Sequence, residues 1–110
     1  MDVGTKTCGS AVVVSVGGRV DATTAPELSN KLAQLVGEGQ SRMVLSLDKL
    51  EYVSSAGLRA FLATAKLINA KNGKLVVSGL QGSVKQVFEI SGLLPIFNVV
   101  ATEAEALKQF

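Results

Sequence analysis

The chain has 110 residues, the usual size of one domain, so we expect a single domain that covers residues 1–110. Apolar residues make up 47% of the chain and charged residues 18%, a balance that excludes an intrinsically disordered regulator. The net charge of +2 comes from lysines and arginines scattered along the sequence without a basic run, so we expect no binding to nucleic acid.

The beginning of the chain predicts a β-hairpin. Residues 11–16 form a valine-rich run that ends at Gly17-Gly18, a pattern typical of a buried strand. Residues 3–7 predict an extended segment before it, and Gly9-Ser10 supplies a turn between the two segments. We therefore expect one antiparallel pair of strands at the start of the fold.

A helix is predicted after this hairpin. Thr24 and Glu27 have the spacing of a capping box, and Pro26 suits the first turn, where its missing N–H has no helical partner. Gly37 or Gly39 ends the helix. The apolar residues of this helix recur at helical spacing and are Leu28, Leu32, Leu35 and Val36.

The remainder of the chain alternates between strands and helices. Residues 43–47, 75–77 and 97–100 are short apolar runs typical of strands. Helices are predicted from Ser54-Ser55 to Asn72-Gly73, after a cap at Ser83, and from Thr102, which has capping-box spacing to Glu105. Because such alternation requires crossover connections, we expect an α/β fold with a mixed, mostly parallel sheet of four to five strands and about four helices.

The sequence points to the cytoplasm. The lone Cys8 cannot form an internal disulfide, which fits a reducing compartment. The first residues lack the charged and then apolar layout of a signal peptide. The apolar stretches are too short to span a bilayer. We therefore expect a cytoplasmic protein without membrane insertion.

The absence of histidine removes Ser-His-Asp and Cys-His sites and the usual zinc ligand sets. Asp21 and Asp48 are expected near the carboxyl edge of the sheet, where two carboxylates can hold Mg²⁺, but the same residues also suit solvated turns. The adjacent acidic residues and the late lysine of a response-regulator receiver are missing. Gly73-Lys74 lacks the spacing of a phosphate-binding loop. We expect no enzyme activity, no cofactor and no bound metal.

Ser54 and Ser55 begin the longest predicted helix. Serine is a favoured N-cap that contributes about 1 kcal/mol, so the pair admits a purely structural interpretation. A helix needs only one cap, however, and Gly57 in the first turn costs up to about 1 kcal/mol relative to alanine. The glycine therefore predicts that another backbone comes close to this turn.

Three segments of the sequence together resemble one protein family. Residues 47–58, which include Tyr52-Val53-Ser54-Ser55-Ala56-Gly57-Leu58, resemble the signature of the STAS-domain family, and specifically its stand-alone bacterial anti-sigma factor antagonists. Residues 18–28 are similar to the family's turn from strand to helix. Residues 91–97 and 102–107 are similar to its C-terminal segment. The three motifs occur in order and cover essentially the whole chain.

The resemblance implies a phosphorylation site at Ser55, because the family phosphorylates the serine that precedes a small residue, glycine and leucine. Many members have aspartate at the preceding position, where this chain has Ser54, so the choice between the two hydroxyls stays open. The resemblance also implies a partner-binding surface formed by Asp21, Thr24, Ser54, Ala56, Gly57 and Arg59.

By this resemblance, the unphosphorylated protein binds an anti-sigma factor that is also an ATP-dependent serine kinase. Phosphorylation of Ser55 releases that partner, and a metal-dependent serine phosphatase resets the switch. The fold should tolerate the phosphate, because a helix N-terminus presents free N–H groups and the positive end of the helix dipole. The alternative is a STAS subunit that does not switch, in a lipid-transport ABC complex or a stressosome-like scaffold.

Overall fold

Six strands form one mixed sheet in the computed structural model, which describes residues 1–110. The strand order is β1-β2-β3-β5-β6, and β4 pairs with β2 outside this path. β1 and β2 are antiparallel, whereas all other pairs are parallel. The strands are β1 (Asp2–Cys8), β2 (Ala11–Val20), β3 (Arg42–Ser46), β4 (Leu50–Val53), β5 (Lys74–Ser78) and β6 (Asn98–Val100).

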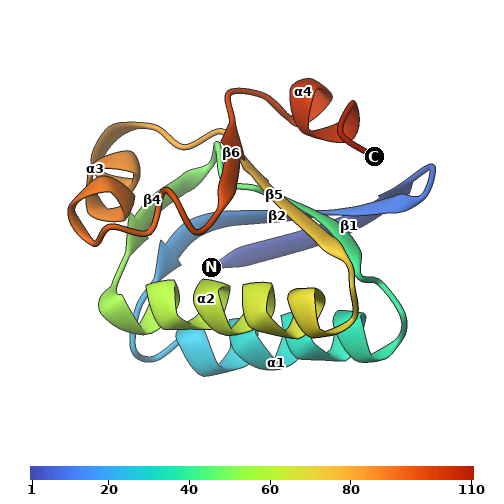
Figure 1. Ribbon diagram of the computed structural model, residues 1–110. Helices are drawn as coiled ribbons and strands as arrows, with labels where there is room; N and C mark the ends of the chain where they lie inside the picture. The colour runs from blue at the N-terminus through green and yellow to red at the C-terminus, as the bar shows by residue number, and fades with distance from the viewer.

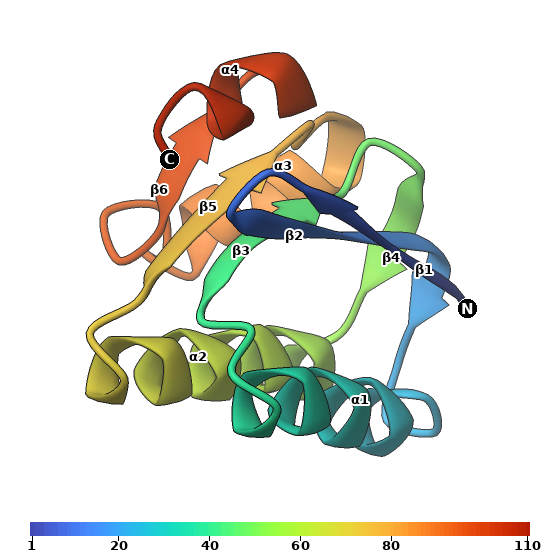
Figure 2. The same ribbon diagram turned by 90° about the vertical axis from the view of Figure 1, so that its right-hand side faces the viewer.

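The four helices are divided between the two faces of the sheet (Figure 1). α1 and α2 lie side by side on one face, and α4 lies on the opposite face against β3 and β5 (Figure 2). α3 packs against β4. None of the helices combines the length and the apolar character that a membrane span requires. Their bounds are α1 (Ala25–Gly37), α2 (Ser55–Ala70), α3 (Gly82–Ile90) and α4 (Glu103–Leu107).

Side chains that alternate along the central strands fill two apolar layers. On β2, Val12, Val14 and Val16 belong to the main core beneath α1 and α2. Val13 instead joins a smaller cluster on the α4 side. Because both faces are covered, the central strands have continuous apolar runs in place of polar alternation.

Three aromatic rings connect α2, α3 and the segment before β6. The rings of Phe61 and Phe88 have centroids 6.2 Å apart, and those of Phe88 and Phe97 are 5.8 Å apart in an edge-on arrangement. Phe88 is fully buried. This cluster fixes α3 to the rest of the main core, since aromatic pairs at such separations add to the stabilisation from burial alone.

The α/β fold, the initial hairpin and the four helices confirm the sequence predictions. β4 was not predicted, so the sheet has one strand more than expected. β2 also continues beyond Gly17-Gly18 to Val20, because Gly18 adopts a positive φ of 79° and the pairing register with β4 shifts there. The predicted cap at Ser83 is wrong, since α3 begins at Gly82 and its N-cap is Gln81, two residues earlier. The Thr102 cap is correct: its hydroxyl accepts from the Glu105 N–H at 3.2 Å.

Candidate functional site

The serine pair lies at the junction between β4 and α2. The Ser54 N–H donates to the Val20 carbonyl at 2.9 Å, which ties the junction to the end of β2. Ser54 has an extended backbone (φ −89°, ψ 174°), and its hydroxyl accepts from the Gly57 N–H at 3.3 Å. Ser54 is therefore the N-cap of α2, and Ser55 is the first residue of the helix.

The two hydroxyls differ in what surrounds them. Ser54 is half-buried and its hydroxyl oxygen is engaged by the capping hydrogen bond. Ser55 is exposed to solvent, and its hydroxyl takes no part in capping. Of the two serines, Ser55 presents the hydroxyl that another protein can reach without disturbing the start of the helix.

Gly57 is buried directly behind the serines. A Cβ atom at this position would lie 2.7 Å from Val53 Cγ2 and 2.8 Å from Val20 Cγ1. Both distances are shorter than the contacts that Cβ atoms make in proteins. Glycine thus lets the first turn of α2 sit directly on the ends of β2 and β4. The neighbours that come close are two valine side chains and not another backbone, so the expectation of a close backbone was wrong in that detail.

A tight turn at Asp21 precedes α1 on the adjacent strand end. The Asp21 Oδ1 atom accepts from the N–H groups of Thr23 at 3.0 Å and Thr24 at 3.1 Å. In return, the Thr24 hydroxyl accepts from the Asp21 N–H at 2.9 Å. The predicted capping box between Thr24 and Glu27 is wrong: Thr24 has helical backbone angles and makes no side-chain cap. Its hydroxyl is already bound to Asp21, which organises this turn.

The hydrogen bonds of this turn favour the ionised form of the Asp21 carboxyl. The Thr24 backbone N–H, followed by the weaker hydrogen bonds of Thr23 and the Thr24 hydroxyl, holds the pKa of the Asp21 carboxyl below its ordinary value of 3.8. Hydrogen bonds donated to a carboxyl lower its pKa, because they are stronger when the carboxyl is charged. The carboxylate is therefore charged at neutral pH.

Asp21→Asn should reduce the dependence of stability on acid pH. Because the folded pKa is lowered, ionised Asp21 stabilises the protein above the ordinary pKa of 3.8, and this stabilisation is lost as pH falls through the folded pKa. The thermal midpoint, followed by circular dichroism from pH 7 down to pH 2, should fall more for the natural chain than for the variant. Glu51→Gln, at an exposed carboxylate, is the control; identical acid profiles for Asp21→Asn and the natural chain would contradict the prediction.

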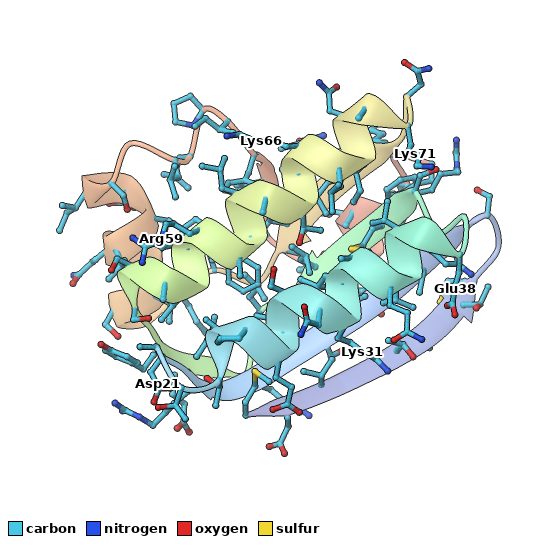
Figure 3. All side chains as sticks on the ribbon, turned by 90° about the horizontal axis from the view of Figure 1, so that it is seen from below. Asp21, Lys31, Glu38, Arg59, Lys66 and Lys71 are labelled. Carbon is cyan, nitrogen blue, oxygen red and sulfur yellow. The ribbon has the colours of Figure 1, made fainter.

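The remaining predicted site residues, Ala56 and Arg59, differ in their exposure to solvent. Ala56 is half-buried against the main core, and Arg59 is exposed on α2. Figure 3 shows Arg59 and Asp21 toward the same end of the helical face, where α1 and α2 begin. Asp48 lies elsewhere, in the turn after β3, where its carboxylate accepts from the Ser46 hydroxyl at 3.2 Å. No group of three potential metal ligands is present.

One contact near the serines was not predicted from the sequence. The Arg19 guanidinium lies 4.3 Å from the centroid of the Tyr52 ring, and these residues are register partners on β2 and β4. Tyr52 is 39% exposed, so this stacked pair forms part of the surface beside Ser54. The missing signal was β4 itself, since the pairing of Arg19 with Tyr52 depends on that strand.

Comparison with known proteins identifies the family of the chain. Residues 3–106 match the family model described as STAS domain. The chain is 40% identical over 99 residues (90% of this chain, 85% of the relative) to BtrV of Bordetella bronchiseptica, assigned as an anti-sigma factor antagonist. It is 33% identical over 93 residues (84% and 86%) to the anti-sigma-B factor antagonist of Staphylococcus aureus.

A solved structure also has the same fold. The crystal structure of an anti-sigma factor antagonist from Mycobacterium paratuberculosis superimposes with a TM-score of 0.89 at 25% identity, covering 98% of this chain and 92% of that one. The family model spans nearly all of the chain, including the Asp21 turn, the serine pair and the C-terminal segment. The chain therefore belongs to the STAS-domain family, as its three motifs predicted.

Proposed function

We propose that this chain is an anti-sigma factor antagonist that acts as a phosphorylation-controlled partner switch. In its unphosphorylated form it binds an anti-sigma factor with serine kinase activity, and phosphorylation of Ser55 releases that partner. The names of the two relatives at 40% and 33% identity support the class of function. The observation that carries the switch is the exposed hydroxyl of Ser55 at the first position of α2.

The contrast between the two serines supports Ser55 as the phosphosite. A kinase must reach the hydroxyl oxygen, and a phosphate on half-buried Ser54 would crowd the oxygen that accepts from the Gly57 N–H. Loss of such a cap destabilises a helix by about 1 kcal/mol. Modification of Ser55 leaves this cap in place, so the protein can be phosphorylated without loss of its fold.

The surface that we assign to the partner is called the switch face and comprises Asp21, Thr24, Ser54, Ser55, Ala56 and Arg59. These residues come from the turn before α1 and from the first turns of α2. Gly57 is buried, so its contribution is to hold the serines in place. The turn at Asp21 is fixed by its own hydrogen bonds, and the serine junction is fixed to β2 by the Ser54 N–H.

The phosphate acts through charge at this face. It brings about −1.5 to −2 charges, which the first turn of a helix tolerates because of its free N–H groups and dipole. Inside an interface the same group must lose water or face acidic groups of the partner. A penalty of about 3 kcal/mol weakens binding by more than about a hundredfold. Neither catalysis nor a cofactor is needed in this chain: kinase and metal-dependent phosphatase activities belong to its partners in the cytoplasm.

Phosphate mapping tests the proposal. The natural chain, Ser55→Ala and Ser54→Asp are each incubated with the cognate kinase and ATP, and the products are mapped by mass spectrometry. Ser54→Asp keeps a residue that caps helices well, so its fold is preserved. We expect one phosphate on Ser55 in the natural chain and in Ser54→Asp, and none in Ser55→Ala. A label on Ser54 alone would overturn the site, and no label in any variant would favour the subunit that does not switch.

A further inference from the structure

A row of three serines crosses the face of the sheet opposite to α1 and α2. Ser15 on β2 pairs with Ser46 on β3, and Ser46 pairs with Ser78 on β5. Their neighbours Val14, Leu45 and Val77 point into the main core, so side-chain alternation turns the serines to the other face. Because adjacent strands lie about 4.8 Å apart, the serine row presents three hydroxyls at that spacing.

Burial increases along the serine row. Ser15 is exposed, Ser46 is 6% exposed and Ser78 is 1% exposed. The Ser46 hydroxyl donates to Asp48 Oδ1 at 3.2 Å, but the Ser78 Oγ atom has no hydrogen-bond partner and is the only buried side-chain polar atom of the chain in this situation. Buried hydroxyls without partners are rare, because their lost hydrogen bonds to water are not replaced. An ordered water or a ligand is therefore expected to bind Ser78 Oγ.

All three serines line a groove of about 1260 Å³. Its walls come from the β1–β2 hairpin, the turn that leads into β4, and the residues before α3 and α4. No residue of the switch face lines it. The groove also lies at the carboxyl ends of the parallel strands β3 and β5, the edge where open α/β sheets bind their ligands. It is therefore a second candidate site, separate from the phosphorylation switch.

The charges around the groove select the class of ligand. Asp2, Asp48, Glu51 and Glu103 line it, against the side chain of Lys49 and the N-terminal ammonium of Met1. Only Glu103 has an ion pair, with Lys6 at 2.8 Å. This excess of carboxylates disfavours phosphates and other anions and favours an ammonium group. The hydroxyls of the serine row and of Thr102 suit a ligand that has hydroxyl groups of its own.

We propose that this groove binds a small hydroxylated amine, such as an amino sugar. Ser78 Oγ exchanges a hydrogen bond with a ligand hydroxyl, which satisfies the one buried group that the fold leaves without a partner. The Asp48 carboxylate, held by Ser46, accepts from the ligand ammonium. Charge-assisted hydrogen bonds of this kind are about twice as strong as neutral ones, so the amine should contribute much of the affinity.

Titration with glucosamine, followed through the backbone amide resonances, tests this site. Saturable shifts should appear at the serine row and at Asp48, with half-saturation at about 1–10 mM, the range of a small ligand with few contacts. Glucose, which lacks the ammonium, should bind about tenfold more weakly, and glucose 6-phosphate should not bind. The proposal would be overturned if glucosamine gave no saturable shifts, or if glucose 6-phosphate bound more tightly than glucosamine.

Ser78→Ala separates a binding role from a structural one. The variant removes only the buried hydroxyl, so glucosamine should bind about tenfold more weakly while the thermal midpoint stays the same or rises. Ser83→Ala, at an exposed serine outside the groove, should change neither quantity. A lower midpoint with unchanged glucosamine affinity would show that Ser78 is satisfied within the fold and would refute the site. None of these results bears on phosphorylation of Ser55.

Discussion

The protein phosphorylated on Ser55 should bind the cognate anti-sigma factor more than about a hundredfold more weakly than the unmodified protein. The Ser55→Asp variant should bind it at least about tenfold more weakly. The aspartate has a smaller charge than the phosphate, so it should reproduce only part of the effect. Ser55→Ala removes an exposed hydroxyl that caps nothing, and should bind like the natural chain. Isothermal titration calorimetry against the purified partner measures all three.

The controls separate loss of binding from loss of fold. Circular dichroism should show the same helix content and thermal midpoint for both Ser55 variants, because the cap at Ser54 is untouched. Ser54→Asp places the same charge one residue earlier, at the half-buried N-cap where the Gly57 N–H can bind the carboxylate, so it should weaken binding less than Ser55→Asp. Equal affinities for Ser55→Asp and Ser55→Ala would count against the switch.

Phe88→Ala should lower the free energy of unfolding by about 3–5 kcal/mol, the usual range for truncating a buried phenylalanine. Phe88 is fully buried and its ring packs against both Phe61 and Phe97, so the cavity would open where α3, α2 and the segment before β6 meet. That loss is a large part of the stability of a small domain. Chemical denaturation monitored by circular dichroism gives the value.

Ile90 offers a matched control on the same helix. It is 86% exposed, so Ile90→Ala removes a similar apolar side chain without opening a cavity, and should change stability by less than about 0.5 kcal/mol. If Phe88→Ala and Ile90→Ala had the same effect, the aromatic cluster would not be the contact that holds α3 in place.

Local patterns predicted those features that depend on local hydrogen bonds and periodicity. The sequence predicted a serine cap for α2 and Thr102 as the cap of α4, and in the structure the hydroxyls of Ser54 and Thr102 each bind an N–H three residues later. Thr24 has the same local signature, but Asp21 competes for its hydroxyl, so the signature failed there. A capping motif is thus reliable only when no other group of the turn can bind the same hydroxyl.

Features that depend on pairing between distant strands were not predictable in the same way. β4 has only four residues, of which two are exposed, so its pattern resembles a loop until β2 is placed beside it. The serine row is a clearer case. Ser15, Ser46 and Ser78 are separated by about thirty residues each and come together only through the register of three parallel strands.

The length of β2 has a consequence for how tightly the partner can be held. Its first half pairs with β3 and its end pairs with β4, so one continuous strand contacts both parts of the switch face. The turn at Asp21 follows that strand directly, and the Ser54 N–H is bonded to its last residue, Val20. The surface is thereby preorganised, so little conformational entropy is lost when a partner docks. Affinity can then depend on a single added charge, because no compensating rearrangement is available to absorb it.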